Sequence, residues 1–260
     1  MTRHGGRPTP LLVALVFLFV SDRVQAQTPP DGQLWFEFTL SWPKTPRLTY
    51  QIDLEPQFLV IIPPGESAWA TLQVTPSVEY AVKRWLDVVG QFLYAPTKQT
   101  NHENSREVTS RAGVRFHLLS RDLPTHDRDR LRELPPSRRL VLRDFARIEQ
   151  RNIFYSDGKS TSHTWRFRNR LEFQLPLNHE NMTVDNTRYF MTDWEWFVPI
   201  GGDARERFAN KQRIRVGFGY RQNFKWRYEA LYIWGRSLDT TTNSFTTADN
   251  IIYFGVKRMF

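Results

Sequence analysis

The chain has no cysteine. It can therefore form no disulfide and no thiolate metal site, and it offers no cysteine for lipid attachment after export. Beyond the N-terminus no run approaches eighteen apolar residues, so the sequence predicts no transmembrane helix there. No long segment has helical periodicity, and no G-x-S-x-G sequence of a serine hydrolase is present. These absences exclude a helical membrane protein and leave little sign of an enzyme.

Lysine is also scarce, with 7 Lys against 29 Arg, although the net charge is +9. A basic chain can bind nucleic acid. Here, however, the arginines alternate along predicted strands, and the N-terminus indicates export. Guanidinium groups pair with carboxylates and phosphates in a two-pronged geometry. We therefore expect the arginines to line a lumen or contact lipid phosphates, and we expect no nucleic-acid partner.

Residues 1–26 have the features of a cleaved signal peptide. Arg3 and Arg7 form a basic start, Leu11 to Val20 form an apolar stretch, and Val24-Gln25-Ala26 resembles a cleavage site. An uncleaved anchor is the alternative, but about ten apolar residues are too few for a helix that needs roughly twenty. Removal of this segment takes away three arginines and one aspartate and leaves a charge of +7. The remaining 27–260 would form one large β domain.

Strict alternation of apolar and charged residues is the main signal in the chain. In Trp165 to Leu175 one parity is almost entirely apolar, whereas the other carries Arg166, Arg168, Arg170 and Glu172. Successive side chains of a strand point to opposite faces. Similar alternation occurs near residues 34–42, 48–55, 69–81, 85–96, 107–118, 138–154, 188–199, 213–221, 226–237 and 249–260. The chain is predicted to be all-β.

Two architectures fit this alternation. A soluble β protein buries its apolar face, whereas a transmembrane barrel turns that face to lipid and its polar face to the lumen. In Trp226 to Trp234 an apolar face carries a tryptophan at each end. Eight residues would span roughly 27 Å, or about 20 Å after tilting, close to the apolar band of an outer-membrane barrel. We therefore predict an antiparallel transmembrane β-barrel in the outer membrane of a Gram-negative bacterium.

The C-terminus supports this prediction. The chain ends in a strand whose alternate residues are apolar, and its last residue is aromatic, as in the assembly signal of bacterial outer-membrane barrels. Arg258 departs from that pattern. The candidate assembly signal comprises Ile252, Phe254, Val256 and Phe260.

Eleven strands can be counted, whereas bacterial barrels have an even number, so we predict about twelve (range 10–14). If Phe260 is periplasmic, the turns at 43–46, 83–84, 120–137, 178–187 and 222–225 lie on its side, and 238–248 forms an outer loop. The stretch Arg121 to Arg139 is rich in charge and proline, which is typical of a short helix or a mobile loop.

The charged parity defines a candidate inward ladder, in which facing Arg and Glu residues could pair across strands about 4.8 Å apart. Three interpretations remain open: a structural ion-pair network, an anion-preferring pore lining, or a binding or catalytic pocket. The lumen-lining candidates are Arg111, Arg115, Arg147, Glu149, Arg151, Arg166, Arg168, Arg170, Glu172, Glu195, Arg213, Arg215, Arg227 and Glu229. Arg143 and Asp193 belong to the same ladder. Candidates for aromatic girdles at the membrane edges are Trp42, Trp69, Trp85, Trp165, Trp226 and Trp234.

Catalytic and metal-binding motifs are weak. Asp157-Gly158-Lys159-Ser160 ends like a phosphate loop, but Ile153 stands where the first glycine is needed. The tripeptides at His102 and His179 lack the second histidine of a zinc helix. Asp157, Ser160, Ser162 and His163 lie close together in a predicted outer loop, where a hydrolase could place its site. We expect no metal and no cofactor.

Several blocks together resemble a proteobacterial outer-membrane barrel family known as a domain of unknown function, number 2490. They are VTPSVEYAVKRWLDVVGQ (74–91), RRLVLRDFARIEQRN (138–152), WRFRNRLEF (165–173), EWFVP (195–199), ERFANKQRIRVGFGYR (206–221) and RYEALYIW (227–234). The resemblance covers nearly all of 27–260. It implies an outer-membrane location but no reaction, ligand or catalytic residue.

The sequence therefore favours a porin-like or structural outer-membrane barrel, with a small-solute channel as the first hypothesis. An outer-membrane enzyme acting on lipid or peptide and a soluble periplasmic protein that binds an apolar ligand are the alternatives. The expected partners are membrane lipid, lipopolysaccharide and the barrel-assembly machinery, and the expected state is a monomer.

Overall fold

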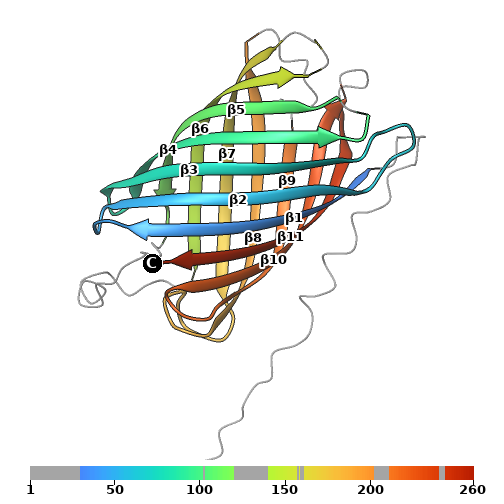
Figure 1. The fold of residues 1–260 in the computed structure, drawn as a ribbon. Coiled ribbons are helices and arrows are strands. Elements are labelled where there is room, and N and C mark those ends of the chain that lie inside the picture. Colours follow the sequence, from blue (N-terminus) through green and yellow to red (C-terminus); the bar gives the residue numbers. More distant parts are fainter. Residues whose placement is uncertain are drawn as a thin grey trace, which may run out of the picture.

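The protein forms one closed β-barrel, described here from a computed structural model (Figure 1). The structure describes residues 30–101, 103–119, 140–156, 158, 161–201, 211–239 and 244–260. The strands are β1 (Asp31–Pro43), β2 (Leu48–Ile61), β3 (Trp69–Lys83), β4 (Leu86–Gln99), β5 (Ser105–His117), β6 (Val141–Tyr155), β7 (Ser162–Pro176), β8 (Thr187–Ile200), β9 (Lys211–Arg221), β10 (Trp226–Asp239) and β11 (Ser244–Met259).

Each strand pairs with its neighbour in the sequence in antiparallel register, and β1 pairs with β11 to close the sheet. The described residues form eleven strands, which is the number counted directly from the sequence. The general rule that bacterial barrels have an even number of strands, on which the prediction of about twelve was based, does not apply to this barrel as described. An odd meander brings its first and last strands together in the same direction, so the β1·β11 pair is parallel. The expectation of a wholly antiparallel barrel is wrong at this one pair.

The alternation sorts side chains between the two faces of the barrel wall. In β7, Arg166, Arg168 and Arg170 line the interior, whereas Trp165 is 48% exposed on the outer face and Leu171 is exposed there too. The same holds in β1, where Glu37 lines the interior and Phe38 is exposed outside. The apolar parity therefore forms the outer surface, and the charged parity fills the barrel.

The turns are grouped as the alternation predicts. The odd-numbered strands β1, β3, β5, β7 and β9 finish at the barrel end where β11 finishes, and the even-numbered strands finish at the other end. We call these the C-terminal end and the opposite end. At the C-terminal end Met182 of the β7–β8 turn is buried, and its carbonyl oxygen accepts a hydrogen bond of 3.0 Å from Arg221. This turn therefore packs into the barrel mouth.

An apolar cluster fills part of the interior. It is built mainly by inward side chains of β8, β10 and β11, joined by Trp35, Val141 and Met182, and its most buried members are Tyr189, Ile233 and Ile251. Most of the remaining inward side chains are polar or charged.

Some predictions fall on residues whose structure is not described. The predicted signal peptide at 1–26, the stretch Arg121 to Arg139, His102, and Asp157, Lys159 and Ser160 lie outside the described ranges. Among the residues that the structure does describe, no helix is long and apolar enough to cross a membrane.

Candidate functional site: a charged barrel lumen

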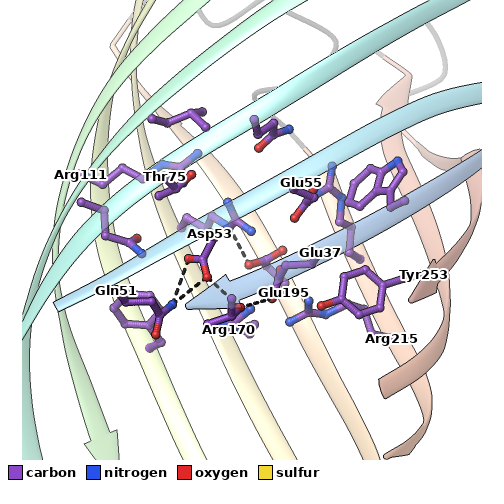
Figure 2. Close-up of a pocket in the computed structure, with 18 of the residues that line it drawn as sticks. Glu37, Gln51, Asp53, Glu55, Thr75, Arg111, Arg170, Glu195, Arg215 and Tyr253 are labelled. Carbon is purple, nitrogen blue, oxygen red and sulfur yellow. Dashed lines mark hydrogen bonds and ion pairs between the residues drawn. The ribbon is translucent and has the colours of Figure 1, made fainter. Parts of the chain in front are cut away.

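A cavity of about 780 Å³ runs along the barrel interior. All eleven strands contribute to its lining, from Gln33 and Lys211 near the opposite end to Ser41 and Lys225 near the C-terminal end. Figure 2 shows carboxylates and arginines from different strands around this cavity. Its lining is therefore mainly polar and charged.

The structure places thirteen of the fourteen lumen candidates in the lining of this cavity. They are Arg111, Arg115, Arg147, Arg151, Arg166, Arg168, Arg170, Glu172, Glu195, Arg213, Arg215, Arg227 and Glu229. The fourteenth, Glu149, is completely buried behind the arginines that it binds. Arg143 also lines the cavity.

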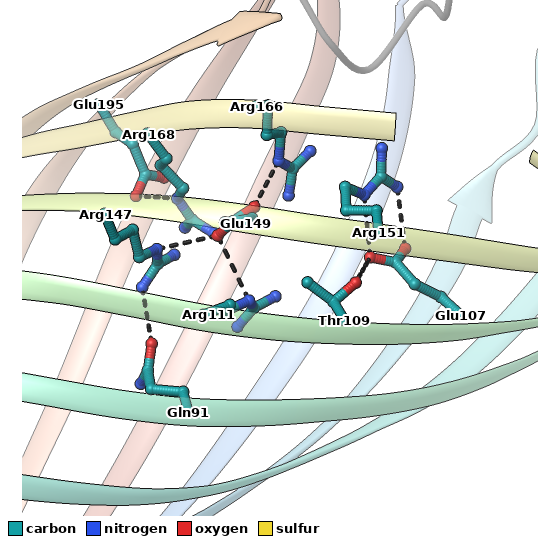
Figure 3. A network of polar contacts seen from close by, with 10 residues as sticks. All are labelled: Gln91, Glu107, Thr109, Arg111, Arg147, Glu149, Arg151, Arg166, Arg168 and Glu195. Carbon is teal, nitrogen blue, oxygen red and sulfur yellow. Dashed lines mark hydrogen bonds and ion pairs between the residues drawn. The ribbon is translucent and has the colours of Figure 1, made fainter. Parts of the chain in front are cut away.

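Glu149 is the centre of the densest charge cluster (Figure 3). Its carboxylate lies 3.3 Å from Nε of Arg111 and 2.9 Å from Nε of Arg147. It also pairs with Arg166 and lies 3.4 Å from Arg168, which bridges to Glu195 at 2.6 Å.

The strand register produces this cluster. Arg111 of β5 and Arg166 of β7 are the direct cross-strand partners of Glu149 on either side. Arg147 lies two residues away on the same strand and the same face. One carboxylate thus holds three strands together, and the excess of guanidinium over carboxylate leaves this part of the wall positive.

Neighbouring ion pairs extend the cluster. Arg151 binds Glu107 in a two-pronged contact of 3.0 and 2.9 Å, a geometry that makes charge-assisted hydrogen bonds strong. Nε of Arg215 lies 2.8 Å from each carboxylate oxygen of Asp193. Most arginines of β5–β9 therefore serve first to hold the wall together.

Two inward phenylalanines, which the sequence analysis did not single out, support the arginines. The guanidinium groups of Arg166, Arg168 and Arg213 lie 4.9, 4.6 and 5.3 Å from the ring centroid of Phe197. Phe145 is similarly surrounded by Arg115, Arg147 and Arg170, at 5.0, 5.1 and 6.0 Å. Cations within about 6 Å of an aromatic face are attracted to it. The signal was visible, since each phenylalanine interrupts a charged parity.

The opposite side of the lumen is acidic. Glu37 on β1 and Asp53 and Glu55 on β2 line the cavity there. Neutral side chains contact them: the Thr39 hydroxyl lies 2.8 Å from Asp53 and 3.0 Å from Glu37, and Gln57 donates to Glu55. The sequence analysis placed these carboxylates on the polar parity but did not select them as site residues.

The charges of the lining are thus divided by sector. Within the described residues, β1–β4 supply five lining carboxylates and no lining Arg or Lys, whereas β5–β9 supply eleven Arg or Lys and three carboxylates. We call these sectors the acidic wall and the basic wall. Because β1–β4 and β5–β9 are consecutive runs in a closed barrel, the two walls face each other across the lumen.

A comparison with protein families identifies the chain at this point. The family described as "Protein of unknown function (DUF2490)" matches residues 32–246. The chain belongs to this family. No curated protein matches it. The matched region of this DUF2490 chain begins in β1 and ends in β11, so it contains both the acidic and the basic wall.

Five of the six predicted girdle tryptophans of the DUF2490 chain lie on the outer face near one of the two barrel ends, whereas Trp194 is exposed midway along β8. Trp42, Trp85 and Trp226 are on the outer face near the C-terminal end, and Trp165 and Trp234 are on the outer face near the opposite end. Trp69 corrects the prediction, because it shares its parity with Thr71 and Gln73 and lines the cavity.

The last strand presents its apolar side chains outward. Ile252 and Phe254 are exposed, and Val256 shares their parity. Phe260 stacks on Trp42 at 5.1 Å between ring centroids, and the guanidinium of Arg258 lies 4.5 Å from the Phe260 ring. Arg258, the departure from the apolar pattern, thus packs against the aromatic residue that ends the chain.

Neither a hydrolase centre nor a metal centre is evident in the part of the chain that the structure describes. Ser162 and His163 are adjacent in β7, so their side chains point to opposite faces, and Nδ1 of His163 lies 2.6 Å from the Asn152 side-chain oxygen. No group of three or more His, Asp or Glu side chains in the described ranges could hold a metal ion.

Proposed function

We propose that this protein is an outer-membrane β-barrel whose lumen admits small hydrophilic solutes. One observation carries the proposal. Apolar side chains cover the outside of the closed barrel, and charged side chains fill its inside. Thirty-four large hydrophobic side chains are exposed among the described residues, whereas soluble monomers rarely expose an apolar patch beyond a few hundred Å². In a membrane these side chains would face lipid rather than water, so their exposure would carry no free-energy penalty.

Other features support the membrane location. Five outward tryptophans lie near the two barrel ends, as in the aromatic girdles of outer-membrane barrels. The sequence of residues 1–26 has the pattern of an export signal. We further propose that the protein is a monomer that the barrel-assembly machinery inserts, in contact with lipopolysaccharide and phospholipid.

The lumen favours anions over cations in this proposal. Fifteen Arg or Lys residues line the cavity, against nine carboxylates. The cavity touches residues near both barrel ends, which supports passage along its length. The many internal ion pairs reduce the effective excess of positive charge, so the expected anion preference is modest.

Fractionation tests the location. The full-length protein expressed in a Gram-negative host should stay in the outer membrane after salt and alkaline washes and should leave it only with detergent. Its unheated band should migrate differently from the boiled band on a gel. Release by salt alone would contradict the membrane assignment and would favour a soluble periplasmic barrel.

Planar bilayers test the channel. The purified barrel should give discrete conductance steps, with a reversal potential of anion-selective sign in a potassium chloride gradient. A barrel that inserts, shows heat-modifiable migration and never conducts would be a closed structural protein, and the channel proposal would be wrong.

A further inference from the structure

The carboxylates of β1 and β2 are held in place by neutral hydrogen-bond donors. Gln51 donates to both oxygens of Asp53, at 2.9 and 3.0 Å, and Thr39 donates to one of them at 2.8 Å. Among the described residues, no Lys or Arg lies within ion-pair distance of Glu37, Asp53 or Glu55, in contrast to the four arginines around Glu149. Neutral donors therefore hold these carboxylates, which line the cavity without an ion pair.

Arg213 and Arg170 have the complementary property on the basic wall. Both line the cavity, and in the described part of the chain neither has a carboxylate within ion-pair distance. Arg213 stacks on Trp35 at 5.0 Å and on Phe197 at 5.3 Å, and its buried Nε has no hydrogen-bond partner. Stacking holds a guanidinium by its face and leaves its edge N–H groups available to an anion.

These two sets of residues belong to one site. Arg170 and Arg213 line the same cavity as Glu37, Asp53 and Glu55. Figure 2 shows Glu37, Asp53 and Glu55 around the same cavity as Arg170 and Arg215. At about 780 Å³ the cavity has the size of a small-molecule site.

We infer that the lumen selects solutes that carry both an amine and a carboxylate at separate ends, with the amine at Glu37, Asp53 and Glu55 and the carboxylate at Arg213 and Arg170. A solute with only a positive charge is attracted by one wall and repelled by the other, and the same holds for a solute with only a negative charge. A dipolar solute gains at both walls. The inference rests on the proposed function in taking the lumen as the route of the solute.

The test uses three probes of equal chain length: 6-aminohexanoate, hexanoate and hexylammonium. Binding to the purified full-length barrel in detergent micelles is measured by calorimetry at low ionic strength, where charge interactions are least screened. We expect 6-aminohexanoate to bind at least tenfold more tightly than either singly charged probe. Equal affinities for the three probes would overturn the inference.

Paired variants locate the two ends of the solute. Asp53→Asn combined with Glu55→Gln should lower the affinity for 6-aminohexanoate to that for hexanoate. Arg213→Gln should lower it to that for hexylammonium. Arg188→Gln, which changes an exposed arginine, is the control and should leave all affinities unchanged. Heat-modifiable migration confirms that each variant has folded, and a folded pair that keeps full discrimination would contradict the assignment.

Micelle binding separates this inference from the channel proposal. Discrimination without conductance would remove the channel and keep the dipolar site. Conductance without discrimination would keep the channel and remove the site.

Discussion

The acidic wall and the basic wall are built from the same kind of strand, yet their charged side chains have different partners. On the basic wall a carboxylate such as Glu149 is surrounded by arginines from three strands, so these charges form ion pairs with one another. On the acidic wall Asp53 and Glu55 meet mainly amides and hydroxyls. Ion pairs within the wall stiffen the barrel, whereas a carboxylate held only by neutral donors can still bind a solute. Four substitutions test this contrast.

The largest effect is expected for Glu149→Gln. This change leaves four arginines around a neutral amide, and removal of one partner from a buried ion pair typically costs about 3–5 kcal/mol. The urea midpoint for unfolding in micelles should fall sharply, or the heat-modifiable form should disappear. Glu103→Gln, at an exposed turn residue, is the control. Equal stability of the two variants would mean that the basic wall is not the scaffold.

Gly219→Ala should have the next largest effect. A Cβ at Gly219 would meet the ring of Tyr189, which is fully buried and whose hydroxyl donates to Glu229 at 2.8 Å. Overpacking of this kind typically costs about 1–3 kcal/mol. Gly90→Ala, on the exposed outer face of β4, is the control, because no atom lies within 4 Å of its added Cβ. Similar melting of the two variants would show that the Tyr189 ring can move aside without loss of stability.

Phe197→Leu should have a moderate effect. Leucine keeps most of the apolar volume but removes the ring that three arginines contact, and we expect the loss of this attraction to cost about 0.5–2 kcal/mol in total. The urea midpoint should fall by less than for Gly219→Ala. Phe92→Leu, on the exposed outer face, should change it little. A larger loss from the Phe92 variant would assign Phe197 to ordinary packing.

Asp53→Asn should have the smallest effect and the opposite sign. Asparagine can still accept the hydrogen bond from Thr39, and it removes a carboxylate whose burial no cation offsets. The free energy of unfolding should stay constant or rise by up to about 1 kcal/mol. A clear loss of stability in urea titration would show that this carboxylate is structural, as Glu149 is.

The two faces of the wall could be predicted from the sequence, because strand periodicity maps directly onto inside and outside. The thirteen lining residues and the outward tryptophans follow from parity alone. Trp69 was predicted to be a girdle residue, although it shares the polar parity of β3, and that parity agrees with its position in the cavity lining.

Register and closure could not be predicted in this way. Alternation puts Glu149 inside but does not say that Arg111 and Arg166 flank it, since that depends on how three strands are aligned. The number of strands in the described chain is odd because closure needs only that the edges of β1 and β11 match, and a parallel ladder satisfies both edges. The acidic wall was not predicted, because arginines outnumber the carboxylates on the polar parities and dominate the charge pattern of the sequence.

Because the β1·β11 pair is parallel, the first strand begins and the last strand finishes at opposite ends of the barrel, unlike in an even-stranded barrel. β1 begins at the opposite end, and β11 finishes at the C-terminal end, as Figure 1 shows. In the outer-membrane location that we propose, labels fused before Asp31 and after Phe260 would report from different sides of the membrane. The pair also joins Asp31 to Asp249 with no turn between them, so its loop-closure cost is the largest in the sheet. We expect this pair to form last during folding, and an even-stranded variant made by deleting one β-strand would have to close through a new, antiparallel edge.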